Sequence, residues 1–286
     1  MLELETPHAM REWADTARGA GRRIGFVPTM GYLHDGHLSL VSEALRRADA
    51  CVASIFVNPM QFGAHEDLAA YPRDLERDRA ALERGGVEVL YRPLAQSMYP
   101  RGFQTDVAVT GITSGLCGAA RPGHFRGVTT VVTKLFNAVK PHVAIFGEKD
   151  YQQLAVIRRM TADLDLGIEI IGAPIVRERD GIAMSSRNAY LAAEERIAAR
   201  CLSRALAAAR ERFAAGERDG AALLGAAHAL IDSEPRARID YLELVDADTF
   251  EAVAAIDRPA LLALAVYIGR TRLIDNTVLA ATAPPS

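Results

Sequence analysis

The chain has 286 residues, half of them hydrophobic and 24% charged, which is the composition of an ordinary globular protein and predicts about two domains. Its net charge of −3, without any cluster of Lys or Arg, lacks the basic footprint of a nucleic-acid-binding protein. The three cysteines, Cys51, Cys117 and Cys201, lie far apart with no CxxC pair, which argues against both a disulfide framework and a zinc knuckle.

The N-terminal residues carry no recognisable targeting signal. Met1 to Glu5 contain two acids and no apolar segment of signal-peptide length. No stretch of the chain reaches the roughly 18 apolar residues that cross a bilayer. We therefore expect a cytoplasmic protein that binds neither membrane nor nucleic acid.

The first two-thirds of the chain alternate short apolar runs with helical patterns. The run 23–27 ends at Pro28 and is followed by a helix whose apolar face is Leu38, Val41, Leu45 and Ala48. The run 50–57 is almost continuously apolar, which is typical of a strand covered on both faces. Further strands are predicted at 87–91, 143–146 and 168–172, and further helices at 73–84, 128–139 and 151–163. This rhythm predicts a Rossmann-like, doubly wound parallel sheet of the α/β class in a domain spanning residues 1–175.

The pattern changes near Pro174, and residues 176–286 predict a smaller α+β domain. Its first element is a long amphipathic helix marked by Ile197, Cys201, Leu202, Leu206, Ala209 and Phe213. Strands follow at 239–245, 261–268 and 272–279. The tight Gly269-Arg270 turn between the last two predicts an antiparallel hairpin.

Three polar, glycine-containing segments each follow a predicted strand directly. They are Pro28 to His37, Asn58 to Gly63 and Gly147 to Asp150. In doubly wound sheets, ligands bind outside the carboxyl ends of the strands. We therefore expect the three segments to meet at one edge of the sheet and to form a common site.

His34 and His37 are spaced by three residues where a strand feeds a helix. Near a helix start this spacing places both side chains on the same side, beside N–H groups and a partial positive charge that suit phosphate. Two imidazoles there can donate hydrogen bonds to phosphate oxygens as negative charge develops. A zinc pair or two ordinary loop histidines are the alternatives, although no nearby Cys or His supplies a third zinc ligand at the usual spacing.

The sequence His34-Asp35-Gly36-His37 resembles the HIGH signature of a nucleotidyl-transfer superfamily that includes class I aminoacyl-tRNA synthetases. The longer string PTMGYLHDGH is similar to the pantoate–β-alanine ligase family within it. Other stretches agree in order over nearly the whole chain: residues 57–62 (VNPMQF), 121–128 (RPGHFRGV), 146–153 (FGEKDYQQ) and 184–188 (MSSRN).

This resemblance implies an enzyme that uses ATP to join (R)-pantoate to β-alanine through a pantoyl-adenylate, releasing AMP and pyrophosphate, with Mg²⁺ carried mainly by the phosphates. It also implies a homodimer. His37, His34, Lys149 and Arg187 take catalytic roles in the resemblance, and Gln61 and Gln153 bind pantoate. The ATP-binding positions that it implies are Met30, Gly31, Tyr32, Leu33, His34, Asp35, Gly36, His37, Gly147, Glu148, Lys149, Asp150, Val176, Met184, Ser185, Ser186 and Arg187.

Several of these residues also have plain structural explanations. Lys149 suits a phosphate partner, but a single Lys is more often a solvated surface residue. For Asp150 we favour capping of the following helix over ribose binding. Ser185, Ser186 and Arg187 suit a transferring phosphate, whereas serines are also common loop formers. Gln61 and Gln153 would be read as surface polar residues without the resemblance.

Three further features are open. The connection from Asn58 to Pro72 is long and aperiodic, as in a lid, and is equally explained as an inert surface loop. The acids Asp74, Glu76 and Asp78 stand where the family has an acidic neighbourhood for magnesium, but a solvated, salt-bridged helix face explains them as well. Cys117 is assigned no role. A related nucleotidylyltransferase and a non-catalytic nucleotide-binding module remain the alternative functions.

Overall fold

A computed structural model describes residues 1–64 and 66–280 and divides the chain into two compact units. The first unit comprises Met1–Thr113 and Arg121–Val176, and the second comprises Ser114–Ala120 and the chain from Arg177 onward. A functional domain boundary between residues 175 and 176 stays a prediction. That prediction contains no element corresponding to the short helix α5 (Leu116–Ala120), which belongs to the second unit.

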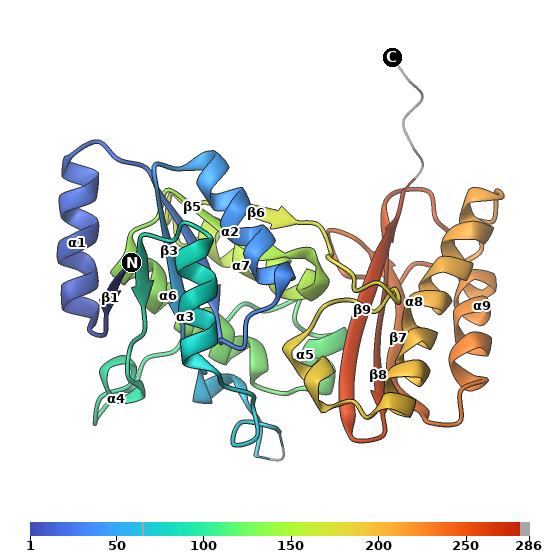
Figure 1. Ribbon diagram of the computed structural model, residues 1–286. Helices are drawn as coiled ribbons and strands as arrows, with labels where there is room; N and C mark the ends of the chain where they lie inside the picture. Colours follow the sequence, from blue (N-terminus) through green and yellow to red (C-terminus); the bar gives the residue numbers. More distant parts are fainter. Residues whose placement is uncertain (65, 281–286) are drawn as a thin grey trace. The chain divides into compact units, whose positions relative to one another are not determined.

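A six-stranded parallel sheet forms the centre of the first unit, as predicted for the α/β class (Figure 1). The strand order is β1-β4-β3-β2-β5-β6. The strands are β1 (Leu2–Leu4), β2 (Ile24–Thr29), β3 (Ala50–Ile55), β4 (Val89–Tyr91), β5 (Val143–Gly147) and β6 (Glu169–Ala173). Pro28 lies inside β2 rather than beyond its end, paired in register with Ser54.

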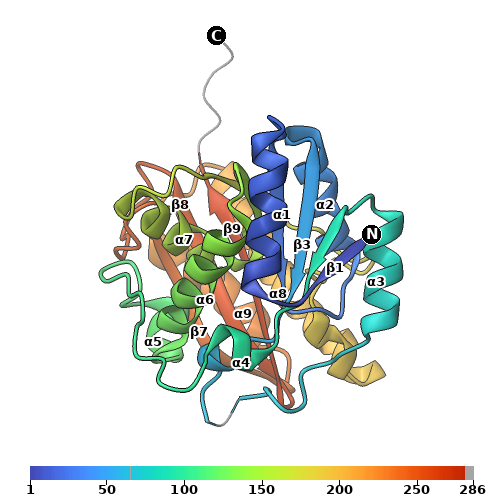
Figure 2. The same ribbon diagram turned by 90° about the vertical axis from the view of Figure 1, so that its left-hand side faces the viewer.

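Helices cover both faces of this sheet (Figure 2). On one face α1 (Pro7–Gly19), α6 (His124–Val139) and α7 (Tyr151–Asp163) pack on alternate residues of the central strands, such as Phe26 and Ala144. On the other face α2 (Asp35–Arg47) and α3 (Leu75–Arg84) pack on the intervening residues, such as Val27 and Val143. Burial on both faces explains the nearly continuous apolar runs.

The predicted apolar face of α2 is wrong in part. The helix buries Leu40, Val41 and Ala44, whereas Leu45 is 38% exposed. The cause is close packing against β2 at Gly25, where an added Cβ would lie 3.1 to 3.2 Å from side chains of α2 and its C-cap. Small residues of the helix therefore face the strand, and the larger Leu45 turns outward.

Among the described residues, the predicted elements did not include four α-helices, namely α1, α4 (Ala95–Met98), α5 and α9, or the strand β1. Helix α1 has clear signals, since Thr6 accepts a hydrogen bond from Ala9 N at 3.2 Å and a proline occupies the first turn. Helix α9 (Gly220–Asp232) is rich in Ala and Leu on all sides and buries Leu223, Ala227 and Ile231 at spacings of four. The strand β1 has only three residues.

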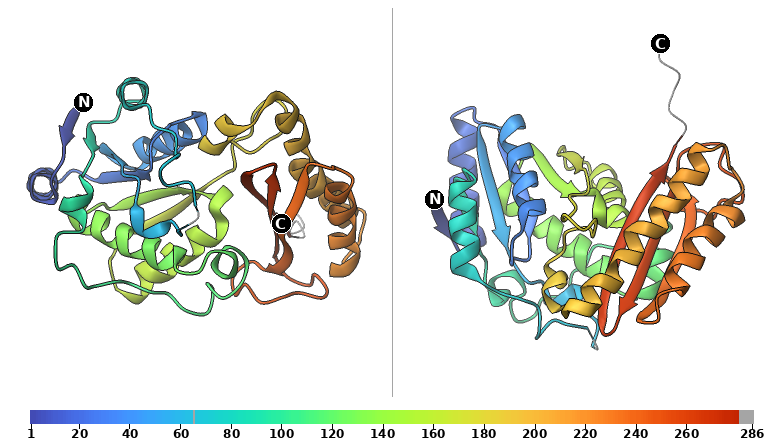
Figure 3. Two further views of the ribbon diagram at one scale, coloured as in Figure 1. Left: turned by 90° about the horizontal axis from the view of Figure 1, so that it is seen from below. Right: turned by 45° about the vertical axis from the view of Figure 1, so that its right-hand side comes forward.

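The second unit is a three-stranded antiparallel sheet covered on one face by α8 and α9 (Figure 3). Its strands are β7 (Ala237–Asp246), β8 (Ala260–Ile268) and β9 (Thr271–Leu279). The hairpin predicted at Gly269-Arg270 is confirmed, because Ile268 pairs with Thr271. The long predicted helix is α8 (Ala193–Ala214); its buried face matches the prediction except at Ile197, which is 66% exposed. Among the described residues no helix is long and apolar enough to cross a membrane.

Candidate active site

The three segments expected to share an edge do so. They follow β2, β3 and β5, which are neighbours in the parallel sheet, so their carboxyl ends point to the same side. The segment after β2 leads into α2, that after β3 forms the single turn η1 (Pro59–Gln61), and that after β5 forms η2 (Glu148–Asp150) before α7. The first unit therefore brings the HDGH turn, Gln61 and Lys149 to one edge.

The turn that leads to His34 has an unusual backbone. Gly31 and Tyr32 both have positive φ angles, +88° and +53°. Asp78 on α3 accepts hydrogen bonds from Tyr32 N at 2.6 Å and from Leu33 N at 2.7 Å. The neighbouring Arg77 donates to Leu33 O at 2.6 Å. A pair of residues on α3 thus holds the turn from both its N–H and its carbonyl side.

The interpretation of Asp78 as part of a solvated acidic face is therefore wrong. Asp78 is 1% exposed, and both of its carboxylate oxygens are occupied by backbone amides. The pKa of Asp78 is raised by burial, and the two amide hydrogen bonds offset part of that rise. Asp74 caps α3 by accepting from Arg77 N at 3.2 Å, and Glu76 pairs with Arg79 at 2.9 Å. No group of three His, Cys, Asp or Glu side chains within residues 1–64 and 66–280 is arranged to hold a metal ion.

His34 and His37 lie side by side at the start of α2, with ring centroids 4.0 Å apart. His34 N donates to His37 Nδ1 at 3.3 Å, so Nδ1 is unprotonated and the proton of the neutral ring is on Nε2. Burial lowers the pKa of His37 well below its usual value, with further lowering by the charges of His34 and Lys149. His37 is therefore a neutral Nε2–H donor at a helix N-terminus, and the charge of Lys149 acts on its ring.

The residues after β5 add a cation to this edge. Lys149 is largely buried, and its Nζ lies 3.7 Å from Asp150 Oδ2. Asp150 occupies the N-cap position of α7, but its side chain accepts no hydrogen bond from the described amides of the first turn, so the capping interpretation is wrong. Burial lowers the pKa of His124, and the charge of Asp150 offsets only a small part of that lowering. Gln153 lies half-buried on the first turn of α7.

Gln61 is held in a hydrogen-bonded setting that the sequence alone did not reveal. Its Oε1 accepts from Asn58 Nδ2 at 3.1 Å, and its Nε2 lies 3.1 Å from Met30 Sδ. Met30 belongs to the HDGH-bearing turn, so this contact joins the segments after β2 and β3. Asn58 is 1% exposed, and the sequence predicted no role of its own for this residue.

The backbone of Gln61 is fixed by the N-terminus of α6. His124 Nδ1 lies 2.9 Å from Gln61 O, and Arg121 donates to the same carbonyl at 3.2 Å. Burial, with the charge of Arg121, lowers the pKa of His124 to about 4, so the ring is neutral and its Nδ1–H is the donor. Arg121 also pairs with Glu66 at 2.6 Å. At Gly127 an added Cβ would lie 2.2 Å from Met60 O, so α6 and η1 are in direct contact.

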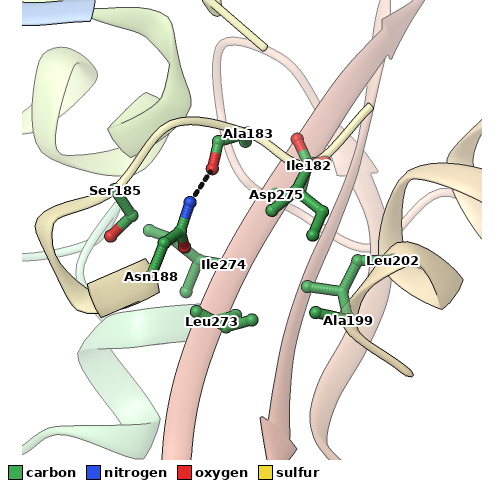
Figure 4. Close-up of a pocket in the computed structure, with 9 residues that line it drawn as sticks. All are labelled: Ile182, Ala183, Ser185, Asn188, Ala199, Leu202, Leu273, Ile274 and Asp275. Carbon is green, nitrogen blue, oxygen red and sulfur yellow. Dashed lines mark hydrogen bonds between the residues drawn. The ribbon is translucent and has the colours of Figure 1, made fainter. Parts of the chain in front are cut away.

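The segment resembling a phosphate-closing loop lies in the second unit. Ser185 Oγ accepts from Arg187 N at 3.2 Å at the start of η3 (Ser186–Tyr190). Asn188 donates to Ala183 O at 3.1 Å, and the cavity beside it has a volume of only about 10 Å³ (Figure 4). This cavity is far too small for a nucleotide.

An ion pair fixes the base of the same segment. Arg177 binds Asp275 of β9 through two hydrogen bonds of 2.6 and 3.0 Å, and the Asp275 side chain is 2% exposed. Met184, Ser185, Ser186 and Arg187 are therefore carried by a well-anchored loop of the second unit. Val176 is the last residue of the first unit.

Comparison with known proteins gives a consistent result over the full length. Residues 3–278 match the family model described as pantoate-beta-alanine ligase. Curated proteins called pantothenate synthetase are similar: that of Syntrophus aciditrophicus is 55% identical over 97% of both chains, and that of Syntrophobacter fumaroxidans is 58% identical over 98% of this chain and 99% of its own.

Solved structures agree with this match. A pantothenate synthetase from Thermus thermophilus has a TM-score of 0.93 and 46% identity, with 98% of this chain and 100% of that chain covered. A pantoate-beta-alanine ligase from Francisella tularensis, described as complexed with beta-gamma ATP and beta-alanine, has a TM-score of 0.82 and 33% identity over 97% of each chain.

Proposed function

Because the chain belongs to the pantoate–β-alanine ligase family, we propose that the edge formed after β2, β3 and β5 is where it activates pantoate as an acyl-adenylate. The enzyme is an ATP-dependent ligase that joins pantoate to β-alanine. The observation that carries the proposed site is His37, a half-buried, neutral Nε2–H donor at a helix N-terminus beside Lys149.

The proposed reaction has two steps. A pantoate carboxylate oxygen attacks the α-phosphorus of ATP, and the bond from that phosphorus to pyrophosphate breaks. The β-alanine amine then attacks the activated carbonyl carbon, the bond to AMP breaks and the amine nitrogen loses a proton. No step needs a protein nucleophile, so catalysis comes from positioning and from stabilising charge.

The residues of the first unit fit this chemistry. The Nε2–H of His37, the ring of His34 and the ammonium of Lys149 offer donors to phosphate oxygens as negative charge develops. The α2 N-terminus adds the N–H groups of Asp35 and Gly36 and a partial positive charge, while His37 N donates to His34 O at 2.8 Å. The neutral imidazole of His37 can donate its Nε2–H to the negative charge that develops on the phosphate oxygens. Gly147 and Glu148 precede Lys149 at the same edge and are assigned to ATP with it.

The remaining assignments rest on the family. Gln61 and Gln153 bind pantoate, and Met184, Ser185, Ser186 and Arg187 of the second unit act on the phosphates. Val176 contacts adenine. Mg²⁺ fits best as an ion carried by the ATP phosphates, since both oxygens of Asp78 are already engaged by backbone amides.

The state of the protein in the cell completes the proposal. We assign it to the cytoplasm as a homodimer whose domains are residues 1–175 and 176–286. Light scattering on the purified protein measures the oligomeric state, and a monomeric mass at micromolar concentration contradicts the dimer.

The decisive experiment is isotope exchange in the absence of β-alanine. The purified protein is incubated with ATP, Mg²⁺, pantoate and labelled pyrophosphate. An acyl-adenylate mechanism gives label in ATP only when pantoate is present. A protein that binds ATP without exchange and forms no AMP when β-alanine is added is a nucleotide-binding module, and a product that retains the nucleotide identifies a nucleotidylyltransferase.

A further inference from the structure

Tyr99, directly after α4 (Ala95–Met98), donates its hydroxyl proton to Asn58 Oδ1 at 2.7 Å. Its ring is held independently, at centroid distances of 6.3 Å from Phe56 and 5.1 Å from Phe103, with Lys134 Nζ 6.0 Å from the ring centroid. Burial raises the pKa of Tyr99, so the hydroxyl keeps its proton at neutral pH. The hydroxyl is therefore a dependable hydrogen-bond donor on a rigid ring.

The partners of Asn58 fix which way its amide points. Its Nδ2 donates to Gly127 O at 3.1 Å, and a carbonyl oxygen can only accept. Its Oδ1 accepts from Met60 N at 3.3 Å and from the hydroxyl of Tyr99, and a backbone N–H can only donate. The shorter of the two bonds to Oδ1 comes from Tyr99. Because Asn58 is 1% exposed, bulk water has little access to replace that bond.

The orientation of Asn58 fixes the orientation of Gln61 in turn. The second Nδ2 proton of Asn58 points to Gln61 Oε1 at 3.1 Å, so the carbonyl end of the Gln61 amide is already engaged. The NH₂ end faces Met30 Sδ, a weak acceptor that leaves donor capacity for a ligand. A substrate group that meets Gln61 here must accept hydrogen bonds, as a carboxylate or hydroxyl oxygen does.

We propose that Tyr99 is a positioning residue for pantoate: through Asn58 it holds the Gln61 amide with its N–H donors toward the substrate. This inference rests on the proposed function, which places pantoate at Gln61. Tyr99 itself touches Asn58 and its aromatic neighbours, and it acts only through the amide chain. Without the hydroxyl, Asn58 Oδ1 keeps only the longer bond from Met60 N, so both amides gain freedom to rotate.

The test is Tyr99→Phe, which removes one oxygen atom and keeps the ring packing. One neutral hydrogen bond corresponds to roughly a three- to ten-fold effect, so we expect the KM for pantoate to rise by about that factor. The KM values for ATP and β-alanine stay within two-fold of wild type. Tyr91→Phe is the matched control, because that buried tyrosine hydroxyl lies 3.9 Å from Met98 Sδ and on no path to Gln61. It leaves all three KM values unchanged.

A double-mutant cycle then shows whether Tyr99 acts through Gln61. Gln61→Ala alone raises the KM for pantoate, and adding Tyr99→Phe to it causes no further rise if the chain of contacts is real. Independent effects that multiply overturn the inference. So does an equal rise in all three KM values, which indicates general loosening of the fold.

The two proposals fail in different ways. If wild-type protein shows no pantoate-dependent pyrophosphate exchange, the proposed function fails before any variant is made. If wild type exchanges normally and Gln61→Ala leaves the KM for pantoate unchanged, the placement of pantoate at Gln61 is wrong and the inference falls with it. If Gln61→Ala raises that KM and Tyr99→Phe does not, the inference about Tyr99 alone is refuted.

Discussion

Replacing Asp78 with Asn tests whether the HDGH turn depends on a carboxylate from α3. Asp78 offers one oxygen to Tyr32 N and the other to Leu33 N, at 2.6 and 2.7 Å. Asn has a single carbonyl oxygen, so Asp78→Asn leaves one of these amides facing an NH₂ group. The turn loses a hydrogen bond to a charged acceptor, and a buried N–H is left without a partner.

The expected size follows from opposing effects. A hydrogen bond to a charged group contributes about 1.5–3 kcal/mol, and Asn retains part of the other bond. Removing the charge relieves the penalty of burying it, which is the main cause that raises the pKa of Asp78. We expect the free energy of unfolding to fall by about 1–2 kcal/mol. Activity falls further, by on the order of 10²-fold, if His34 and His37 move by about an ångström.

Urea denaturation and pantoate-dependent pyrophosphate exchange measure the two effects. Glu76→Gln is the matched control, because this carboxylate lies on the same helix with its side chain 79% exposed and pairs only with Arg79 among the hydrogen bonds described. In the control, the free energy of unfolding stays within roughly 0.5 kcal/mol of wild type, as expected of surface changes, and the exchange rate stays within about two-fold. If Asp78→Asn behaves like Glu76→Gln in both assays, the turn does not depend on the carboxylate and the reasoning is refuted.

Three further outcomes are expected. His37→Ala lowers turnover by on the order of 10²–10³, whereas His8→Ala, at a 73% exposed side chain, leaves it unchanged; equal effects mean that His37 has no part in the chemistry. The pKa of His37 is lowered in the folded state, so the unfolded chain binds the proton first as pH drops below about 6.5. The free energy of unfolding therefore falls, by up to about 1.4 kcal/mol per pH unit from this group. The urea midpoint of His37→Gln falls less between pH 7 and pH 5.5 than that of wild type. Gly127→Ala lowers the free energy of unfolding by about 1–3 kcal/mol, because the added Cβ would clash with η1. Gly225→Ala, where an added Cβ meets nothing within 4 Å, leaves that free energy unchanged or raises it. Comparable urea midpoints for the two variants contradict the close contact.

The sheet and the edge that carries the candidate site were predictable because their signals are local. Apolar runs of strand length, followed at once by glycine and polar residues, identified β2, β3 and β5 and the side on which their loops meet. The bounds of α7 agree with the prediction at both ends. Helix α1 was missed although Thr6 and Pro7 supply ordinary start signals.

The residues that support the site were not predictable in the same way. Asp78 lies 45 residues from Leu33 in the sequence, and on a helix rich in charged residues it has the local pattern of a solvated acid. His124 lies 63 residues from Gln61. Nothing in the spacing around either residue indicates its partner, because the contact exists only after the sheet has brought distant loops together.

These long-range contacts share a physical purpose that bears on how the site works. Asp78 binds backbone amides of the HDGH turn, His124 binds the backbone carbonyl of Gln61, and Tyr99 acts on the Gln61 amide through Asn58. Each is supplied by an element separate from the loop that it holds. Dipoles fixed before substrate arrives stabilise developing charge without reorganising during the reaction. In the proposed mechanism, which needs no protein nucleophile, donors fixed in this way contribute to the rate by stabilising the developing charge.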